Sequence, residues 1–543
     1  MDVTWNHRSG LHGPTSEFDK VKIESGSTHV VKALLSRSSK RMASSSSSNR
    51  NHGPIRVGMF GGGTVGGGVY ELVMGRLQHQ RQQEQQRILG QRGFQMCRPM
   101  VITKICVKNL SKPRSFHLDE EMTTLTTNVD SILEDDSIEM IVEVMDGHEV
   151  EIAKYVTERA LAKHKSVVTA NTAMLAQYLD EISTQLSTLQ QQPQKYNHDK
   201  HTHIPSTVGM GYEAAVCGGI PIIHTLQSSC YVGDVIHQIQ GICNGATNYM
   251  LCKMEQSGMD LEDAFSEARE LGYLTDGTES LFNDNDDGYP SSSSADVDGL
   301  DSRDKICLLA KLAFGVTVPP QSVPCRGILR LTSVDFEYAK LLKCTIKLLG
   351  TARRLHHARE WDGPLCVYVS PVMLPKTHVL ANVKSNGNAI AITSANMGTC
   401  SYMGPGSGRF PTANSIVADM SRMAQAKTIG KTPPPPFPCV SQLQEDGISS
   451  PVQLDYDFVG AFYIRIPYAD GLGIIKRVGE LCEEYEISIH SILQNPIRDR
   501  MSADFCITTE DDCKQSQVEA LCEAVSQEYF CRAPCLWMPL LFG

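Results

Sequence analysis

Three glycines at fixed spacing, Gly61, Gly63 and Gly66, form the motif GxGxxG. In this motif the first glycine makes a tight turn, the second lets the backbone approach a pyrophosphate, and the third permits contact between helix and strand. A strand at Ile55–Phe60 precedes the motif and a helix over 64–77 follows it, and the amides of that helix would hold the phosphate charge. The sequence therefore predicts dinucleotide binding, with a flexible glycine-rich turn as the alternative. The predicted cofactor-binding residues of this loop are Gly61, Gly62, Gly63, Thr64, Val65 and Gly66.

The end of the second strand, residues 101–107, indicates which dinucleotide is bound. In proteins that bind NAD, an acidic residue at this point holds the adenosine ribose. Here Lys108, Lys112 and Arg114 follow the strand, and residues 107–114 contain no carboxylate. Cations suit a 2′-phosphate, so the sequence favours NADP over NAD, with Lys108 and Arg114 as its contacts. A solvated basic turn is the alternative.

A second candidate site begins at Asp301, which stands four residues before Lys305 at the start of a predicted helix. The same helix face continues with Leu308, Leu309 and Leu312, so the charged pair lies on the stripe that should face inward. Because burying a charge is costly unless it is paired or functional, the pair is a candidate for chemistry. An ordinary i,i+4 pair on the surface is the alternative. Asp296 adds a further carboxylate five residues earlier.

The elements around these residues alternate between strand and helix, which implies a doubly wound parallel sheet of the Rossmann type. After the glycine loop, strands are predicted at 101–107, 139–145 and 166–170, and a helix is predicted at 152–162. From 212 to about 396 the pattern is mixed α+β, with helices at 260–271 and 303–314. The C-terminal part shows strand, helix and strand at 461–467, 472–485 and 487–493, the start of a small α+β domain.

Composition shifts divide the chain of 543 residues into several parts. Residues 1–54 are polar and without periodicity, and are predicted to be a disordered extension. We expect a dinucleotide-binding domain at 55–207, a substrate-binding and dimerisation domain at 208–430, and a C-terminal domain at 456–543. The chain should return to the nucleotide domain near 404–425. The proline-rich segment 431–455 is the predicted linker, which suggests that the tail can be removed without unfolding the body. Three polar segments are predicted to be inserted surface loops: 78–95, 190–205 and 280–294.

Charge and apolar content exclude several function classes. A net charge of −11 argues against nucleic-acid binding, and no apolar run reaches the length that spans a bilayer. The 18 cysteines are scattered without a CxxC pair, which favours free thiols in a reducing compartment. The expected location is the cytoplasm, with an organelle such as a plastid as the alternative.

Several separated motifs, in this order, resemble homoserine dehydrogenase over most of residues 55–425. They are Gly-Thr-Val-Gly at 63–66, Val-Val-Thr-Ala-Asn at 167–171, Tyr-Glu-Ala-Ala-Val-Cys-Gly-Gly-Ile-Pro at 212–221, Gly-Ile-Cys-Asn-Gly-Ala-Thr-Asn-Tyr at 241–249, the segment 296–305, and Gly-Pro-Gly-Ser-Gly at 404–408 with Thr412 and Ala413. The tail, with Tyr-Ala-Asp-Gly-Leu-Gly-Ile-Ile at 468–475, resembles an ACT domain, a small amino-acid-sensing module.

The resemblance implies reversible hydride transfer between NAD(P)H and L-aspartate 4-semialdehyde, giving L-homoserine. It makes Lys305 the acid/base and gives Asp301 and Asp296 the task of holding the substrate and Lys305. The remaining residues that the resemblance assigns to substrate are Thr275, Asn244 and Gly245; those it assigns to cofactor are Asn171, Thr172, Gly272 and Gly408. The resemblance also implies a monovalent cation such as sodium, bound by Glu213 with the backbone carbonyls of Val216, Gly218 and Ile220.

The chain departs from the family pattern at two positions. Thr172 stands where the family has a lysine, and Thr275 where it has a glutamate. These changes favour the alternative of a regulatory paralogue that keeps cofactor and amino-acid binding but has lost turnover. The intact set of Asp296, Asp301 and Lys305 favours the enzyme. By resemblance a homodimer or homotetramer is expected, with an amino acid, threonine by pathway logic, as effector of the tail.

Overall fold

A computed structural model describes residues 53–87, 98–145, 147, 149–191, 195–197, 202–204, 207–228, 233–274, 294–355, 363–433, 453–496 and 503–541. The predicted extension before residue 53 and most of the predicted linker lie outside these ranges. Thr275 and the predicted acidic insertion up to residue 293 lie outside them too. Within the described residues no helix is long and apolar enough to cross a membrane.

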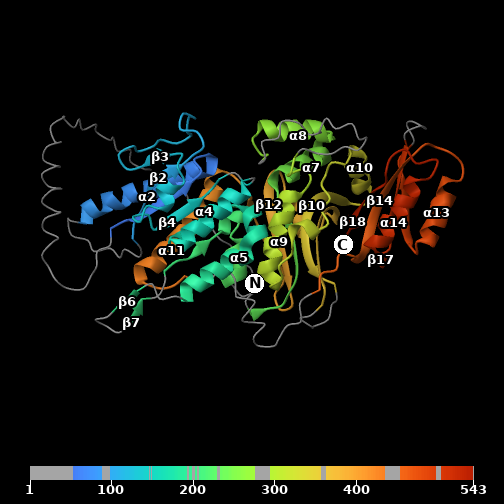
Figure 1. Cartoon of the computed structure of the whole chain (residues 1–543). Coiled ribbons are helices and arrows are strands. Elements are labelled where there is room, and N and C mark those ends of the chain that lie inside the picture. The colour runs from blue at the N-terminus through green and yellow to red at the C-terminus, as the bar shows by residue number, and fades with distance from the viewer. Residues whose placement is uncertain are drawn as a thin grey trace, which may run out of the picture. The chain divides into compact units, whose positions relative to one another are not determined.

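The first sheet consists of six parallel strands, confirming the predicted doubly wound arrangement (Figure 1). Its strands are β1 (Ile55–Phe60), β2 (Met100–Cys106), β3 (Thr124–Thr126), β4 (Met140–Glu143), β5 (Ser166–Thr169) and β8 (Met210–Gly211). They lie in the order β3-β2-β1-β4-β5-β8. The chain order therefore reverses between β1 and β4, and a crevice at the carboxyl ends of strands at such a switch point is where ligands bind in this class of sheet.

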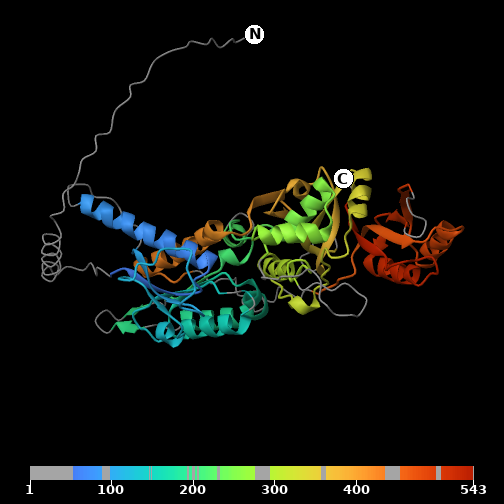
Figure 2. The same ribbon diagram turned by 90° about the horizontal axis from the view of Figure 1, so that it is seen from above.

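Both faces of this sheet are covered by helices. They are α2 (Thr64–Arg87), α3 (Asp130–Leu133), α4 (Val150–Ala162), α5 (Thr172–Gln191) and α11 (Arg409–Ile429). One core joins Ile55, Val57 and Met59 of β1 to α2 and to the returning helix α11, which lies beside α2 (Figures 1 and 2). On the opposite face, Phe60 packs with residues of α3, α4 and α5. Successive side chains of β1 therefore pack into cores on opposite faces of the sheet, as in a strand that is buried on both sides.

Two segments predicted to be surface loops contain regular structure. The glutamine-rich segment 78–95 continues helix α2 as far as Arg87, because Gln, Arg and Glu are strong helix formers even without apolar content. Within 190–205, α5 continues to Gln191, and β6 (Lys195–Asn197) and β7 (Thr202–Ile204) form an antiparallel pair.

The second sheet is mixed. Its strands from the body are β9 (Ile236–Ile242), β10 (Cys344–Arg354), β11 (Leu365–Pro375), β12 (Gly387–Ser394) and β13 (Gly398–Pro405), in the order β13-β12-β9-β10-β11. The helical elements of this region are η1 (Glu213–Ala215), α6 (Ile222–Ser228), α7 (Gly245–Ser257), α8 (Leu261–Glu270), α9 (Leu300–Phe314), η3 (Pro320–Ser322), α10 (Ser333–Leu341) and η4 (Val379–Asn382). Helices α7, α9 and α10 pack against β10.

The tail has the chain order βαββαβ of a ferredoxin-like unit. Its elements are β14 (Val459–Tyr468), α13 (Ile474–Glu484), β15 (Ile489–Gln494), β16 (Ala503–Thr509), the short β17 (Cys513–Lys514), α14 (Gln515–Ser526) and β18 (Leu536–Leu540). The four main strands lie in the order β18-β14-β16-β15. The sequence-based prediction of a small α+β domain is confirmed.

The tail is attached to the body through more than a linker. β18 pairs in parallel with β11 at Met373 and Leu540, which makes the two sheets continuous, and Tyr463 and Met538 belong to the core of the body. A buried carboxylate, Asp335 of α10, accepts hydrogen bonds from Arg465 Nε at 2.8 Å and from Tyr463 at 3.0 Å. The expectation of a separable tail therefore conflicts with the packing, because removing it would expose core surface and strand β11.

We predict that Arg465→Ala destabilises the whole chain, because it leaves the Asp335 carboxylate, whose side chain is 0% exposed, without its cation. Loss of one partner of a buried ion pair costs about 3–5 kcal/mol in the free energy of unfolding. Urea unfolding of the full chain measures this loss. Lys476→Ala, at an 82% exposed lysine of the tail, is the matched control and should leave the unfolding midpoint unchanged. Equal midpoints for the two variants would show that the Asp335 contact does not hold the tail in place.

Candidate active site

The glycine loop between β1 and α2 has the backbone that its motif predicts. Gly61 has φ +104°, and a Cβ there would lie 2.2 Å from the carbonyl oxygen of Val144, so only glycine fits the turn. At Gly66 a Cβ would lie 2.3 Å from the Gly61 oxygen, which places the start of α2 against the loop. At Gly63, in contrast, a Cβ would meet nothing within 4 Å. The loop thus has an open face at the residue where the motif lets a pyrophosphate approach.

The two predicted cations lie beside this loop in different environments. Arg114 folds back onto it, donating from Nη1 to the Gly62 carbonyl at 3.3 Å and from Nη2 to the Asn109 carbonyl. Its Nε is buried without a partner among the described residues. The Lys108 side chain is 74% exposed and pairs with Glu149 at 2.7 Å. Both positions follow β2, which neighbours β1 in the sheet.

Glu143 at the end of β4 is a buried carboxylate at the switch point, and sequence analysis missed it. It is 0% exposed and accepts hydrogen bonds from the Thr169 hydroxyl at 2.5 Å and the Met145 amide at 2.9 Å. Burial raises the pKa of Glu143 to about 7. Thr169 Oγ1 accepts from the Asn171 amide at 3.0 Å, so Glu143 holds the turn that carries Asn171. The signal available in the sequence was an acidic residue closing an apolar strand of a parallel sheet.

Asn171 and Thr172 begin helix α5, and their side chains differ in how they are engaged. Asn171 Oδ1 caps the helix by accepting from the Met174 amide at 2.9 Å, while its Nδ2 is buried without a partner among the described residues. The Thr172 hydroxyl donates to the Ala215 carbonyl at 2.6 Å. Thr172 thus ties α5 to the segment 212–220, whereas Asn171 has an amide available for a ligand.

The segment 212–220 links the first sheet to the second. Cys217, at φ +51°, accepts a hydrogen bond at its Sγ from Asn388 Nδ2 at 3.4 Å, and a Cβ on Gly218 would lie 2.7 Å from the Gly406 oxygen. Both carboxylate oxygens of Glu213 accept amides at the start of α6, from Ile223 at 2.9 Å and His224 at 2.8 Å. Burial, together with the nearby Asp419 carboxylate, raises the pKa of Glu213 to about 7, although these amides oppose the shift.

The Asp301–Lys305 pair lies in a buried network organised by Asn244. Lys305 Nζ donates to Asp301 Oδ2 at 2.6 Å and to the Cys243 carbonyl at 2.9 Å. Asn244 Nδ2 donates to Asp296 Oδ1 at 2.6 Å and to Asp301 Oδ2 at 2.9 Å, and its Oδ1 caps α7 by accepting from Thr247 N at 2.9 Å. The four predicted residues Asn244, Asp296, Asp301 and Lys305 therefore meet, and the surface-pair alternative is wrong: the two side chains are only 22% and 13% exposed.

The position of Lys305 follows from the close approach of α9 to β10. A Cβ on Gly350 of β10 would lie 3.1 Å from Ile306, so the missing side chain lets the helix pack directly on the sheet. Burial alone would lower the pKa of Lys305, but the charge of Asp301 outweighs it and holds the pKa above its usual value. Lys305 is therefore a stable ammonium at neutral pH and can act as a proton donor.

Three further glycines were predicted to bind cofactor or substrate, Gly408, Gly245 and Gly272, and their backbone surroundings differ. Gly408, at φ +120°, precedes α11, and Arg409 beside it donates to the Ser115 carbonyl at 3.0 Å, near the start of α2. A Cβ on Gly245 would lie 2.6 Å from the Asn386 oxygen, which accounts for glycine beside Asn244. Gly272, at φ +70°, follows the end of α8 and has open space around it, so a helix-ending role explains it.

A glycine loop at the switch point of a parallel sheet, with a mostly buried lysine and carboxylates at the start of helix α9 in the adjoining domain, defines an NAD(P)-dependent oxidoreductase. A homoserine dehydrogenase of Synechocystis is 32% identical to the chain over 474 residues, covering 87% of this chain and 96% of the relative. The chain belongs to the homoserine dehydrogenase family.

The other comparisons agree with this assignment. The family model described as homoserine dehydrogenase, NAD binding domain matches residues 61–194, and the one described as homoserine dehydrogenase matches 221–420. The Bacillus subtilis homoserine dehydrogenase is 31% identical, over 82% of this chain and 88% of that protein. The crystal structure of a homoserine dehydrogenase from Thiobacillus denitrificans superposes with a TM-score of 0.69 at 26% identity, over 90% of this chain and 98% of that one. The alternative of a regulatory paralogue without turnover gains no support from them.

We predict that Gly63→Ala folds normally but binds NADPH at least about tenfold more weakly, equivalent to 1.4 kcal/mol, because the added methyl group occupies the open face of the loop. Gly66→Ala is the contrasting variant, since its methyl group would collide with the Gly61 carbonyl and lower the melting temperature. Fluorescence titration with NADPH and thermal unfolding separate the two effects. Wild-type affinity in Gly63→Ala would refute the assignment of the cofactor to this loop.

Proposed function

We propose that the chain reduces L-aspartate 4-semialdehyde reversibly to L-homoserine with NADPH, and that Lys305 supplies the proton. The observation that carries the assignment of roles is the buried network of Asn244, Asp296, Asp301 and Lys305. Bound at the glycine loop, the dinucleotide supplies or accepts the hydride. The open face at Gly63 and the unpartnered amide of Asn171 fit such a ligand.

Lys305 is suited to protonating the oxygen that gains charge when the aldehyde is reduced. An ammonium has three N–H donors, of which two go to Asp301 and the Cys243 carbonyl. The third is left for the substrate oxygen. Asp301 also accepts a hydrogen bond from Asn244, so its carboxylate is fixed and in turn holds the Lys305 ammonium in one orientation. General acid catalysis requires a proton donor that is positioned in this way.

The charge balance of the network favours an amino-acid substrate. Two carboxylates, Asp296 and Asp301, face one ammonium, Lys305, so the network has an excess of one negative charge. Asp296 is 0% exposed and accepts from the same Asn244 amide that donates to Asp301. The ammonium group of homoserine would balance this charge, and Asn244 and Gly245 would then lie beside the substrate at the start of α7. Thr275, the other predicted substrate contact, lies outside the described residues.

Lys305→Ala should reduce kcat by roughly 10²- to 10⁴-fold, as is typical for a general acid, and leave the affinity for NADPH unchanged. The rate of NADPH oxidation with aspartate semialdehyde, together with an NADPH binding titration, measures both. Lys311→Ala, further along α9, is the control, because Lys311 pairs with Asp180 outside the network. More than half of wild-type activity in Lys305→Ala would remove this lysine from the mechanism.

We further propose that the chain prefers NADP over NAD through Lys108 and Arg114. The support is that Arg114 lies on the glycine loop and that Lys108 follows the neighbouring strand. A 2′-phosphate would be a stronger partner for Lys108 than the exposed ion pair with Glu149.

Replacing both Lys108 and Arg114 by alanine should raise KM for NADPH at least about tenfold and leave KM for NADH nearly unchanged, because only NADPH has the phosphate. Steady-state kinetics with both cofactors measures this difference. Lys163→Ala, an exposed lysine after α4, serves as the control for general charge. Equal effects on both cofactors would mean that the two cations only support the loop.

A monovalent cation at the turn 216–220 is also proposed. Among the described residues Gly218 O accepts one hydrogen bond, from Ser415 at 2.6 Å, and Ile220 O accepts one, from the Ile222 amide at 2.8 Å. A carbonyl oxygen has two lone pairs, so each retains one for a cation, together with Val216 O. The Glu213 carboxylate already accepts two amides and would contribute charge rather than a free oxygen. Replacing sodium by a tetraalkylammonium ion at constant ionic strength should therefore lower the activity of the chain.

For the tail we propose an ACT-like role, with an amino acid such as threonine as effector and a homodimer or homotetramer as the assembly. The βαββαβ order supports it. The proposed functional division remains 55–207 for the dinucleotide, 208–430 for substrate and 456–543 for regulation. Because the tail shares a sheet and core with the substrate region, an effector bound there has a direct structural route to it. An unchanged melting temperature and unchanged activity with threonine would exclude this effector.

A further inference from the structure

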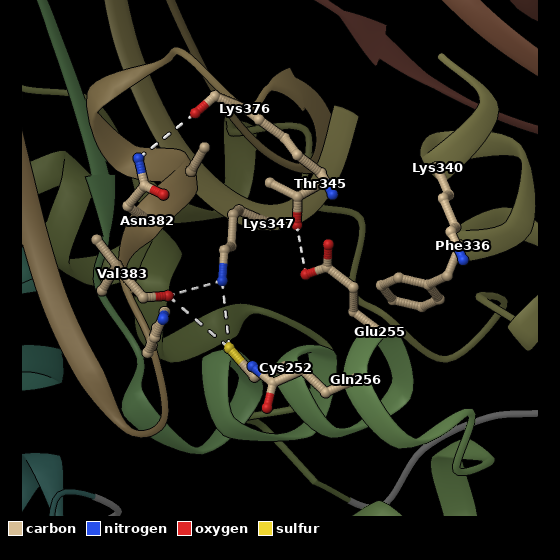
Figure 3. A pocket seen from close by; sticks show the side chains of 12 residues that line it. Cys252, Glu255, Gln256, Phe336, Lys340, Thr345, Lys347, Lys376, Asn382 and Val383 are labelled. Atoms are coloured by element: carbon tan, nitrogen blue, oxygen red, sulfur yellow. Dashed lines mark hydrogen bonds between the residues drawn. The ribbon is translucent and has the colours of Figure 1, made fainter. Parts of the chain in front are cut away.

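A cavity of about 350 Å³ lies among α7, α10, β10 and η4, and no residue of the Asp301–Lys305 network lines it (Figure 3). Four lysines line it, Lys340, Lys347, Lys376 and Lys384, against the single carboxylate of Glu255. The lining therefore has a net charge of +3 in a chain whose net charge is −11. A concentration of one sign of charge in a concave surface attracts ligands of the opposite charge.

Lys347 is the buried member of the set. It is only 2% exposed, and its Nζ donates to Val383 O at 2.8 Å and to Cys252 Sγ at 3.3 Å (Figure 3). The same Nζ also donates to Asn248 Oδ1 at 2.9 Å. All three acceptors are neutral, so they satisfy its hydrogen bonds without balancing its charge. Within the described part of the chain, none of the four lysines forms an ion pair. Burying an uncompensated charge is costly, which indicates that a counter-charge is supplied from outside the chain.

We propose that this cavity binds a small phosphate-bearing anion. A phosphate group carries about −1.5 to −2 charges near neutral pH, which matches an excess of three positive charges better than a single carboxylate does. The volume is within the range of small-molecule sites. The Phe336 ring, which lies beside the Glu255 side chain in the lining, provides an apolar wall for the organic part of a phosphate ester (Figure 3).

Isothermal titration of the full chain with inorganic phosphate, and separately with glycerol 3-phosphate, tests the proposal. Saturating NADPH is present throughout, so that the proposed 2′-phosphate contacts are filled, and sodium chloride keeps the ionic strength constant. We expect one site per chain with Kd below about 1 mM for at least one of the two probes. Binding of phosphate alone would identify the free ion as the ligand, and tighter binding of the ester would identify a phosphorylated metabolite.

Lys376→Gln combined with Lys384→Gln should weaken this binding at least tenfold without unfolding the chain, because both lysines are exposed. Lys347→Met should abolish it, with the melting temperature checking the fold. Lys476→Gln, an exposed lysine of α13, is the control and should bind as the wild type does. No saturable binding, or equal affinity in the double variant and the control, would overturn the proposal.

Discussion

Asn244 joins the two carboxylates of the candidate active site to a helix end. Its Nδ2 donates to Asp296 and Asp301, while its Oδ1 accepts the Thr247 amide that begins α7. Both polar atoms of the side chain are thus used, and a buried carboxylate, Asp296, and a partly buried one, Asp301, are held in place beside one ammonium. Without this amide the like charges of Asp296 and Asp301 would lose their shared donor, and Asp301, which binds Lys305 directly, would be held less firmly.

Other contacts position the elements around this network. α9 can present Lys305 because Gly350 lets it pack on β10, and Cys217, which follows η1, accepts a hydrogen bond from Asn388 of β12. Thr172 adds a further contact by its bond to Ala215 O. A threonine in place of the family's lysine therefore keeps a link between the two halves of the site, although it removes a positive charge.

Much of this arrangement could be predicted from local sequence signals. The glycine spacing predicted the turn at Gly61 and the close contact at Gly66, because a side chain at either position would collide with a backbone carbonyl. The i,i+4 spacing of Asp301 and Lys305 on an apolar stripe made an inward-facing pair a candidate, with a surface pair as the alternative, and the structure decides for the inward-facing one. The contact of Asn244 with both carboxylates depends on how α7 packs beside α9 and the turn before it, and it was not predicted, since the resemblance assigned Asn244 only to substrate.

Other features depend on long-range packing for which the sequence has no local signal. Glu143 looked like the end of a strand until Thr169 of the next strand was placed beside it. The tail looked separable because of its prolines, whereas Asp335 and Arg465, 130 residues apart in sequence, are joined in a buried pair. The continuation of α2 to Arg87 has a different cause, since the helix propensity of Gln, Arg and Glu prevails there without any apolar stripe.

We propose Lys305 as the acid/base of the reaction, and its proton affinity is set by the Asp301 carboxylate. In the direction of homoserine oxidation Lys305 must be neutral to act as base, so its raised pKa should make kcat rise with pH into the alkaline range. Asp301→Asn removes the charge that raises this pKa and leaves the burial that lowers it, so the rise should move to lower pH, whatever happens to the maximal rate. The pH profile of kcat for homoserine oxidation, measured for the wild type and Asp301→Asn, is therefore the most direct test. A shift to lower pH is the predicted result, and superimposable profiles would contradict the account.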